Sequence, residues 1–349
     1  MPITLPRKDS MKPELNCEYP EDAEERLFAE MVDIVRARMA HRPQGEGATI
    51  PRAQHAKATG CVRASFTVRD KLPEYFRYGV FQQPGNTFQA IVRFSNALET
   101  IDPDGKGTAR GMAIKLLDVE GTPAIAASRE RCQDFLMVNH PAFPFATPAE
   151  YVKFFEDRAK WGDVWALGRE ALSHARHVQM ILEMRAKKVA SPLEVTYWSG
   201  SPFRFGPTGT NSGRAVKYSV VPTFTGTKMP DHPDAESNSN YLRTALEERL
   251  KVEEAVFDFR VQFQTDAVEM PIEDVSVTWD EAVSPPVSVA TLTIGVQDIN
   301  SSFGVAFAEQ CEKMSFSPWN ALEEHRPMGG INRMRKAVYV ASVAKRGGH

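Results

Sequence analysis

Segments with the composition of β-strands fall into two groups along the chain, and helical segments separate the groups. In residues 255–264 apolar and polar side chains alternate, as in a strand with one buried face. Strand patterns also cover residues 62–68, 89–95, 111–117, 134–138, 194–198, 214–221 and 287–296. Parallel sheets need a crossover between consecutive strands, whereas grouped strands pair antiparallel through short connections. The order of the segments therefore predicts an antiparallel sheet in a fold of the α+β class.

Helical spacing of apolar side chains indicates where the helices lie. After Pro20, Leu27, Met31, Ile34 and Val35 recur at intervals of a helix turn. Further helices are expected within residues 148–188, 302–312 and 331–343.

The pattern also indicates how the domain is bounded. Residues 1–20 are polar and contain four prolines, so we expect an extended N-terminal arm. Residues 21–349 contain no internal repeat or linker-like segment, and we expect them to form a single domain.

Composition excludes several classes of function. The chain has 349 residues, of which 42% are hydrophobic and 25% charged, as is typical of soluble globular proteins. The formal net charge of −3 provides no basic field for nucleic acid. No run of 18 apolar residues predicts a membrane span, and the first residues lack the apolar segment of a signal peptide.

The cysteines indicate a cytoplasmic protein. The four cysteines, Cys17, Cys61, Cys132 and Cys311, are scattered without CxxC spacing, which argues against a zinc knuckle and a covalently attached haem. We therefore expect four reduced, mostly buried thiols and a cytoplasmic location.

The helix expected near the C-terminus places a guanidinium one turn from a phenol. Arg335 and Tyr339 are four residues apart and share one helix face. A positive charge beside a phenol favours its ionised form. A phenolate is an anionic ligand suited to ferric iron. The pair by itself is weakly specific, because many helices carry arginine and tyrosine at this spacing.

Three polar residues early in the chain each have a functional and an ordinary interpretation. His55 could accept and return a proton beside a buried cofactor, although a histidine after a loop is more often a surface residue. Arg93 lies in an apolar strand, where it needs an anionic partner unless the strand is an edge strand and the side chain faces solvent. Ser95 could orient His55 by a hydrogen bond or merely fill a small site.

Six short segments, in chain order, resemble the signatures of the haem catalase family. They are Arg52…His55-Ala-Lys57, Val-Arg93-Phe-Ser95, Arg110-Gly-Met-Ala-Ile-Lys115, Phe135-Leu-Met-Val-Asn-His-Pro141, Phe316-Ser-Pro318 and Arg335…Tyr339. In the third segment the glycine permits close approach of the backbone. No segment is specific alone, but together they extend over most of residues 50–346.

The resemblance implies a catalase-like antiparallel β-barrel core with surrounding helices and a buried haem b. Tyr339 would be the axial ligand of the haem iron, and Arg335 would hydrogen-bond its oxygen and keep it ionised. Arg52, Arg93 and Arg346 resemble the arginines that bind the haem propionates.

The resemblance also assigns the distal side of the haem, where the sequence departs from the family. His55 would be the distal acid–base residue, and Ser95 would support it. An ungapped comparison places Cys132 where the family has its distal asparagine, and Gln133 is a candidate substitute one residue away. Gln54 replaces the small β-branched residue that usually precedes the distal histidine.

Two further departures concern the pocket as a whole. Leu136-Met137 replaces an aromatic-rich pair, and the sequence ends ten residues after Tyr339, without the wrapping segment and helical domain of typical catalases. We therefore expect a more open pocket that admits an organic molecule.

The resemblance with these departures implies a haem b-dependent, peroxidase-like oxidoreductase. It would use hydrogen peroxide or an organic hydroperoxide to oxidise an organic donor. Three alternatives stay open: disproportionation of hydrogen peroxide as in catalases, rearrangement of a lipid hydroperoxide as in allene oxide synthases, and haem binding without turnover. The sequence names neither the donor nor the oligomeric state, and it leaves a homodimer open.

Three other signals have ordinary interpretations. His174 and His177 share a helix face, but a metal needs a third ligand, so we expect a solvated surface. The glycine-rich residues 206–213 lack the Lys-Ser/Thr of a phosphate-binding loop and indicate a connection between strands. The acidic residues 231–236 indicate a solvated loop.

Overall fold

The computed structural model describes residues 12–40, 50–128, 130–207, 213–223 and 237–346. The acidic segment 231–236, most of the glycine-rich segment 206–213 and residues 1–11 of the expected arm lie outside the described residues. The remainder of the arm contains a turn at Leu15 and Asn16 and packs on the molecule, where Asn16 Oδ1 accepts a hydrogen bond of 2.7 Å from the Ala215 amide.

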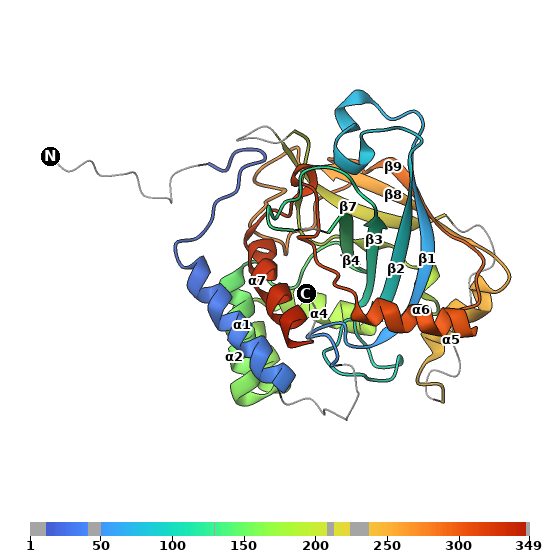
Figure 1. Ribbon diagram of the computed structural model, residues 1–349. Helices are drawn as coiled ribbons and strands as arrows, with labels where there is room; N and C mark the ends of the chain where they lie inside the picture. Colours follow the sequence, from blue (N-terminus) through green and yellow to red (C-terminus); the bar gives the residue numbers. More distant parts are fainter. Residues whose placement is uncertain (1–11, 41–49, 129, 208–212, 224–236, 347–349) are drawn as a thin grey trace.

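A closed antiparallel barrel forms the centre of the molecule (Figure 1). Its strands are β1 (Ala58–Val68), β2 (Thr87–Asn96), β3 (Arg110–Leu117), β4 (Cys132–Val138), β5 (Tyr197–Trp198), β6 (Phe203–Phe205), β7 (Arg214–Pro222), β8 (Ala255–Phe263) and β9 (Val287–Ile294). They pair in the order β5-β4-β3-β2-β1-β9-β8-β7-β6, and β5 also pairs with β7. The second pairing of β5 closes a ring of eight strands, and β6 continues along the same edge of β7. The predicted α+β class and antiparallel barrel are confirmed.

Aromatic rings fill the barrel. The ring of Phe259 lies 4.8 Å from that of Phe135 and 5.1 Å from that of Phe66, and Phe135 lies 5.1 Å from Tyr218. All four side chains are less than 2% exposed. A barrel of eight strands has an interior just wide enough to be filled by side chains, so the interior is a packed core and any ligand site must lie outside it.

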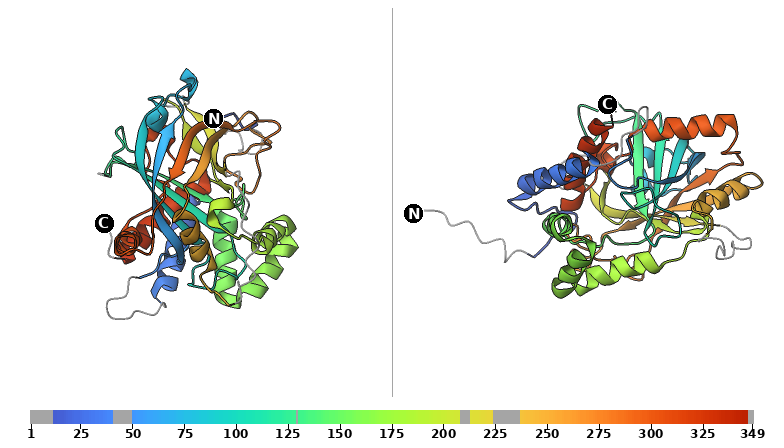
Figure 2. Two further views of the ribbon diagram at one scale, coloured as in Figure 1. Left: turned by 90° about the vertical axis from the view of Figure 1, so that its right-hand side faces the viewer. Right: turned by 90° about the horizontal axis from the view of Figure 1, so that it is seen from below.

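Helices cover the barrel in two sets. They are α1 (Glu24–Ala40), α2 (Pro148–Trp161), α3 (Asp163–Ser173), α4 (Ala175–Ala186), α5 (Tyr241–Leu250), α6 (Ser302–Lys313) and α7 (Gly330–Lys345). The first set comprises α1, α2 and α7, which pack together beside the barrel, while α5 and α6 pack on β1 (Figure 1). Helices α3 and α4 follow α2 at the periphery (Figure 2). Among the described residues, every helix is too short or too polar to cross a membrane.

The apolar stripe of α1 explains why it packs where it does. Leu27, Met31, Val35 and Met39 are spaced by four residues and are all buried, and they form a second core with residues of α2 and α7. Ile34 is half-buried against the same core. This second core holds α7, and with it Tyr339, beside the outer face of the barrel.

The expectation of four reduced thiols is wrong for two of the cysteines. Cys61 in β1 and Cys311 near the end of α6 form a disulfide across 250 residues of sequence. Cys17 and Cys132 are free. The pairing depends on the packing of α6 against β1, which no local sequence pattern records. The disulfide fastens the C-terminal end of α6 to the barrel.

Candidate active site

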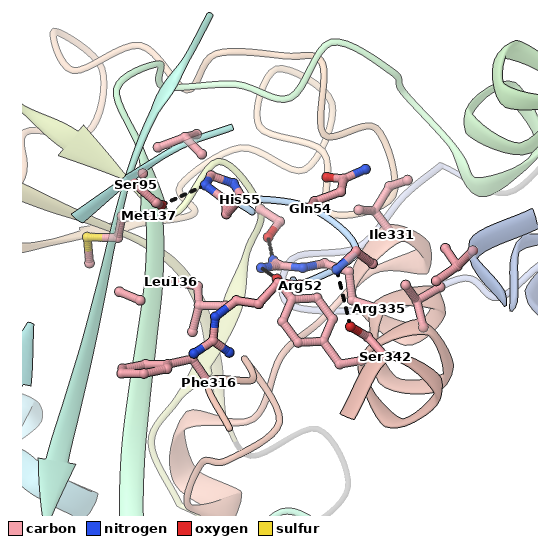
Figure 3. A pocket seen from close by; sticks show the side chains of 18 of the residues that line it. Arg52, Gln54, His55, Ser95, Leu136, Met137, Phe316, Ile331, Arg335 and Ser342 are labelled. Carbon is pink, nitrogen blue, oxygen red and sulfur yellow. Dashed lines mark hydrogen bonds between the residues drawn. The ribbon is translucent and has the colours of Figure 1, made fainter. Parts of the chain in front are cut away.

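One cavity lies between the outer face of β2, β3 and β4, the segment before β1, and α7 (Figure 3). All seven candidate residues from the sequence line it: Arg52, His55, Arg93, Ser95, Arg335, Tyr339 and Arg346. The barrel and the second core thus bring together residues from both ends of the chain. Most of the remaining lining is apolar, from α1, β4 and α7.

His55 is held in an unusual backbone conformation. Its φ of 55° lies in the left-handed region, which residues other than glycine rarely adopt. Its Nδ1 lies 2.9 Å from Ser95 Oγ, and its carbonyl accepts a hydrogen bond of 3.0 Å from Arg93 Nη2. The predicted hydrogen bond between Ser95 and His55 is therefore present, and contacts from β2 fix both the ring and the backbone of the histidine.

Gly111 provides the space that the imidazole occupies. A Cβ atom at this position would lie 2.6 Å from both Cε1 and Nδ1 of His55 and 2.9 Å from Ser95 Oγ. The close approach expected from the Arg110-Gly111 segment is therefore that of the His55 imidazole to the backbone of Gly111.

Burial and positive charge keep His55 neutral. Burial lowers the pKa of His55, and the nearby guanidiniums of Arg93, Arg335 and Arg52 lower it further, to about 3. Near neutral pH the imidazole is therefore free of charge and can accept a proton.

Three arginines that line the cavity contact Glu312, two through its carboxylate and one through its main-chain carbonyl. Arg93 Nε donates to Glu312 Oε1 at 2.7 Å, and Arg52 Nε lies 3.9 Å from Oε2. Arg346 Nη1 donates to the Glu312 carbonyl at 3.2 Å. Burial raises the pKa of Glu312, but Arg93 and Arg52 outweigh it, so its pKa lies below the usual value.

The arginine cluster decides between the two interpretations of Arg93. Its strand lies between β1 and β3, not at an edge, and its side chain is 3% exposed. The solvent-facing alternative is therefore wrong, and the expected anionic partner is present as Glu312. Sequence reasoning missed Glu312, because it lies on α6 and meets these arginines only through the tertiary structure.

The cluster carries more positive than negative charge. Burial, with Arg93 and Arg346, lowers the pKa of Arg52 to about 9. Nε of Arg346 is buried without a hydrogen-bond partner among the described residues. A site with three guanidiniums and one carboxylate is suited to a further anion.

Arg335 and Tyr339 meet as their spacing predicts. Arg335 Nη2 donates to the Tyr339 hydroxyl at 3.3 Å, and its guanidinium carbon lies 5.4 Å from the centre of the phenol ring. Arg335 Nη1 also donates to Asn332 Oδ1 at 3.0 Å. Asn332 is fully buried and is held by the Pro202 and Met328 carbonyls, so the guanidinium has a fixed support.

Gln133 and Cys132 do not reach the cavity, which corrects the proposed substitute for the distal amide. Gln133 is fully buried, and its Oε1 accepts a hydrogen bond from the Leu322 amide at 2.9 Å. Cys132 Sγ lies 3.3 Å from Lys115 Nζ. The cavity is instead lined by the other end of β4, through Leu136, Met137 and Val138.

Gln54 provides the one side-chain amide among the described residues that line the cavity. Its Nε2 donates to the Tyr151 hydroxyl at 2.7 Å. Burial raises the pKa of Tyr151 to about 12, so the phenol stays protonated near neutral pH. The amide is therefore committed to a protein partner next to His55.

The fold is that of the catalases. Three solved structures match at 17% sequence identity. A fungal catalase matches with a TM-score of 0.65 over 97% of this chain and 64% of the fungal chain, and catalase A from Saccharomyces cerevisiae with a TM-score of 0.68 over 98% of this chain and 69% of the yeast chain. A bacterial catalase matches with a TM-score of 0.64 over 97% of this chain and 63% of the bacterial chain. The chain thus spans about two-thirds of the length of these catalases. The resemblance seen in the sequence is confirmed.

Within this fold, the sequence is similar to a shorter protein. It is 28% identical over 316 residues to the catalase-related peroxidase of Mycolicibacterium paratuberculosis (strain ATCC BAA-968 / K-10), and the alignment covers 87% of this chain and 92% of the relative. No family model matches the sequence.

Proposed function

We propose that this protein is a haem b-dependent peroxidase, with residues 21–349 as its haem-binding domain after an N-terminal arm. The observation that carries the proposal is the meeting of two pairs in one cavity, His55 with Ser95 and Arg335 with Tyr339. The similarity to a catalase-related peroxidase supports the same class of reaction.

The residues present fit a haem. Arg52 and Arg93 already contact a carboxylate, that of Glu312, and Arg346 lies beside them; the propionates of haem are carboxylates. The unpartnered Nε of Arg346 is a donor for one of them. Tyr339 would bind the iron as a phenolate, which Arg335 stabilises. When bound, the haem supplies the redox-active iron that takes up the two oxidising equivalents of the peroxide.

His55 moves the proton in this proposal. Its Nδ1 is engaged with Ser95 Oγ, so Nε2 is the atom that exchanges the proton. The neutral imidazole accepts a proton from one peroxide oxygen and delivers it to the other, which leaves as water or an alcohol. For a two-electron donor AH2 the overall reaction is ROOH + AH2 → ROH + H2O + A, where R is hydrogen or an organic group.

The distal lining favours a peroxidase over a catalase. Disproportionation requires a second hydrogen peroxide to be held beside the iron, and hydrogen-bonding side chains do this best. Here Gln54 is the one amide in the lining among the described residues and donates one N–H to Tyr151, and β4 contributes the apolar side chains of Leu136, Met137 and Val138. An apolar surface instead favours an organic hydroperoxide or an organic donor.

A spectrum of the haem-loaded protein tests the proposal. We expect a ferric spectrum with tyrosinate character that changes in Tyr339→Phe. The matched control Tyr75→Phe, at a side chain that is 56% exposed and outside the cavity, leaves the spectrum unchanged. A wild-type protein that binds no haem, or the same spectrum in Tyr339→Phe, would refute the assignment. With hydrogen peroxide and a phenolic donor, oxygen release that exceeds donor oxidation would show a catalase instead.

A further inference from the structure

A second group of chemically active side chains lies outside the cavity, where α2, α3 and α4 meet. Helix α3 ends at Ser173 and α4 begins at Ala175, so His174 lies at the junction between them. The junction gathers Glu170 and His177 around His174, and the first turn of α2 adds Glu150. Three of the four residues lie within one eight-residue segment.

We propose that these four residues bind one divalent transition-metal ion of the zinc class. One ligand atom from each of Glu170, His174 and His177 can be chosen so that all lie within 4.8 Å of one another. Glu170 Oε1 lies 2.9 Å from His177 Nδ1 and 3.2 Å from His174 Nδ1. The carboxylate of Glu150 lies 3.7 Å from His177 Nδ1 and 3.8 Å from His174 Nε2.

These separations are those of atoms that share a small ion. In a tetrahedral zinc site the bonds to nitrogen and oxygen are about 2.0–2.1 Å long, so neighbouring ligand atoms lie roughly 3.3–3.4 Å apart. The distances around Glu170 Oε1 are close to this value. The two imidazole rings are stacked, with centres 4.8 Å apart and planes inclined by 19°. Because the lone pair of an imidazole nitrogen lies in the plane of its ring, one ring must tilt for both residues to bind one ion.

Hydrogen bonding alone does not satisfy the group. The Nδ1 atom of His177 is hydrogen-bonded to Glu170. The Nδ1 atom of His174 is buried and has no hydrogen bond among the described residues, although it lies 3.2 Å from Glu170 Oε1. A nitrogen that is close to a carboxylate oxygen but not bonded to it is arranged as a second ligand of one ion, and a bound ion would use its lone pair.

Burial and charge also suit a divalent cation. His177 is 6% exposed, and the side chain of Glu170 is 11% exposed. Two carboxylates and two neutral imidazoles carry two negative charges, which a divalent ion balances. The expectation of a solvated helix face is wrong for His177, which is buried, and His174 lies between α3 and α4 and not within a helix. In the proposed site α3 supplies the third ligand and α2 a fourth.

The ligand chemistry selects the class of ion. Imidazole suits zinc and its neighbours among the transition metals, whereas calcium and magnesium prefer oxygen ligands alone. Four protein ligands are typical of a structural zinc site, which leaves no open position for a substrate. The ion would fasten the first turn of α2 to α3 and α4. Glu150 precedes Tyr151, so the same helix turn reaches the active-site cavity.

Metal analysis of the haem-loaded full chain tests the site, because iron and zinc are then counted in the same sample. After addition of zinc and dialysis, we expect one zinc retained per chain and a rise in the midpoint of thermal unfolding. We expect His174→Ala and Glu170→Gln to weaken zinc binding at least 100-fold. The matched control is His140→Ala, at a half-buried histidine that contacts its own loop, and this variant should bind zinc as the wild type does.

The variants are also melted in a chelator, which separates a folding defect from loss of the site. His174 is 40% exposed at its side chain, so its truncation leaves little unfilled volume, and the metal-free midpoint should match that of the wild type. Wild-type protein that retains no zinc, or equal retention in His174→Ala and the wild type, would overturn the proposal. The result is independent of the proposed function, because neither zinc retention nor melting in chelator depends on turnover.

Discussion

Because Gly111 packs directly against the imidazole of His55, we predict that adding one methyl group at this position strongly lowers the rate of the reaction. In Gly111→Ala the new Cβ would lie 2.6 Å from Cε1 and Nδ1 of the imidazole, whereas carbon atoms in contact are about 3.5–4.0 Å apart. The strand backbone is fixed by pairing on both sides, so the imidazole must move by about 1 Å. A displacement of this size at a reacting group can cost about 100-fold in rate, which corresponds to ~2.7 kcal/mol.

The assay is kcat/KM for hydroperoxide in the haem-loaded protein, with haem content and unfolding by urea measured in parallel. We expect about a 100-fold loss of kcat/KM with haem content unchanged, and a loss of ~1–3 kcal/mol in the free energy of unfolding from overpacking. The matched control is Gly168→Ala in α3, where a Cβ meets nothing within 4 Å. It should keep full activity and gain ~0.5–1 kcal/mol from helix propensity. Activity within twofold of the wild type in Gly111→Ala would refute the role given to the position of His55.

Three further predictions concern the buried histidines and the disulfide. Because the pKa of His55 lies near 3, kcat/KM should stay flat from about pH 8 to pH 5, and a decrease centred near pH 6.5 would contradict a neutral buried imidazole. Stability should change over the same pH range, since burial also lowers the pKa of His325 to about 3. Near pH 6.5 the unfolded chain takes up protons at His55 and His325, whereas the folded chain does not. Urea titrations should therefore show a loss of up to ~4 kcal/mol in the free energy of unfolding between pH 7 and pH 5, at ~1.36 kcal/mol per pH unit per imidazole. The double variant Cys61→Ser/Cys311→Ser should lose ~2–5 kcal/mol in the free energy of unfolding under oxidising conditions. The control Cys17→Ser should lose little, because Cys17 is free. Equal stability of the double variant and the wild type would show that the disulfide does not stabilise the fold.

The order of the strand segments predicted the class of the fold, and the resemblance to the catalase family predicted the barrel. The long strands have clear alternation or β-rich composition, and their grouping indicates antiparallel pairing. The barrel closes through the second pairing of β5, which has two residues, and β6, which has three, continues along the same edge of β7. Elements this short carry no periodic pattern, so their role depends on which edge of β7 is free.

The candidate site was predicted where each residue lies in a recognisable segment. His55, Arg93 and Tyr339 lie in such segments, and the structure brings them to one cavity. Gln133 was misplaced, because an ungapped comparison ignores the alternation of side chains along β4, which turns Gln133 toward Leu322. Glu312 could not be predicted, because its partners lie far away in the sequence.

The proposed zinc site could also be predicted only in part from the sequence. His174 and His177 were visible as a pair, and Glu170 lies one helix turn before His174. Glu150 belongs to another helix, and only the packing of α2 against α3 brings it within reach. A set of ligands that comes from three helices is therefore incomplete when judged from local spacing.

The position of Glu312 has a consequence for how an anion enters the arginine cluster. Arg52 and Arg93 already have the carboxylate of Glu312 as a partner, so a propionate that binds these two arginines exchanges one carboxylate partner for another. Such an exchange removes little additional charge from water and contributes little net energy. The affinity for haem would then come from its apolar faces and from the bond to the Tyr339 phenolate, while the arginines determine which way round the ring enters.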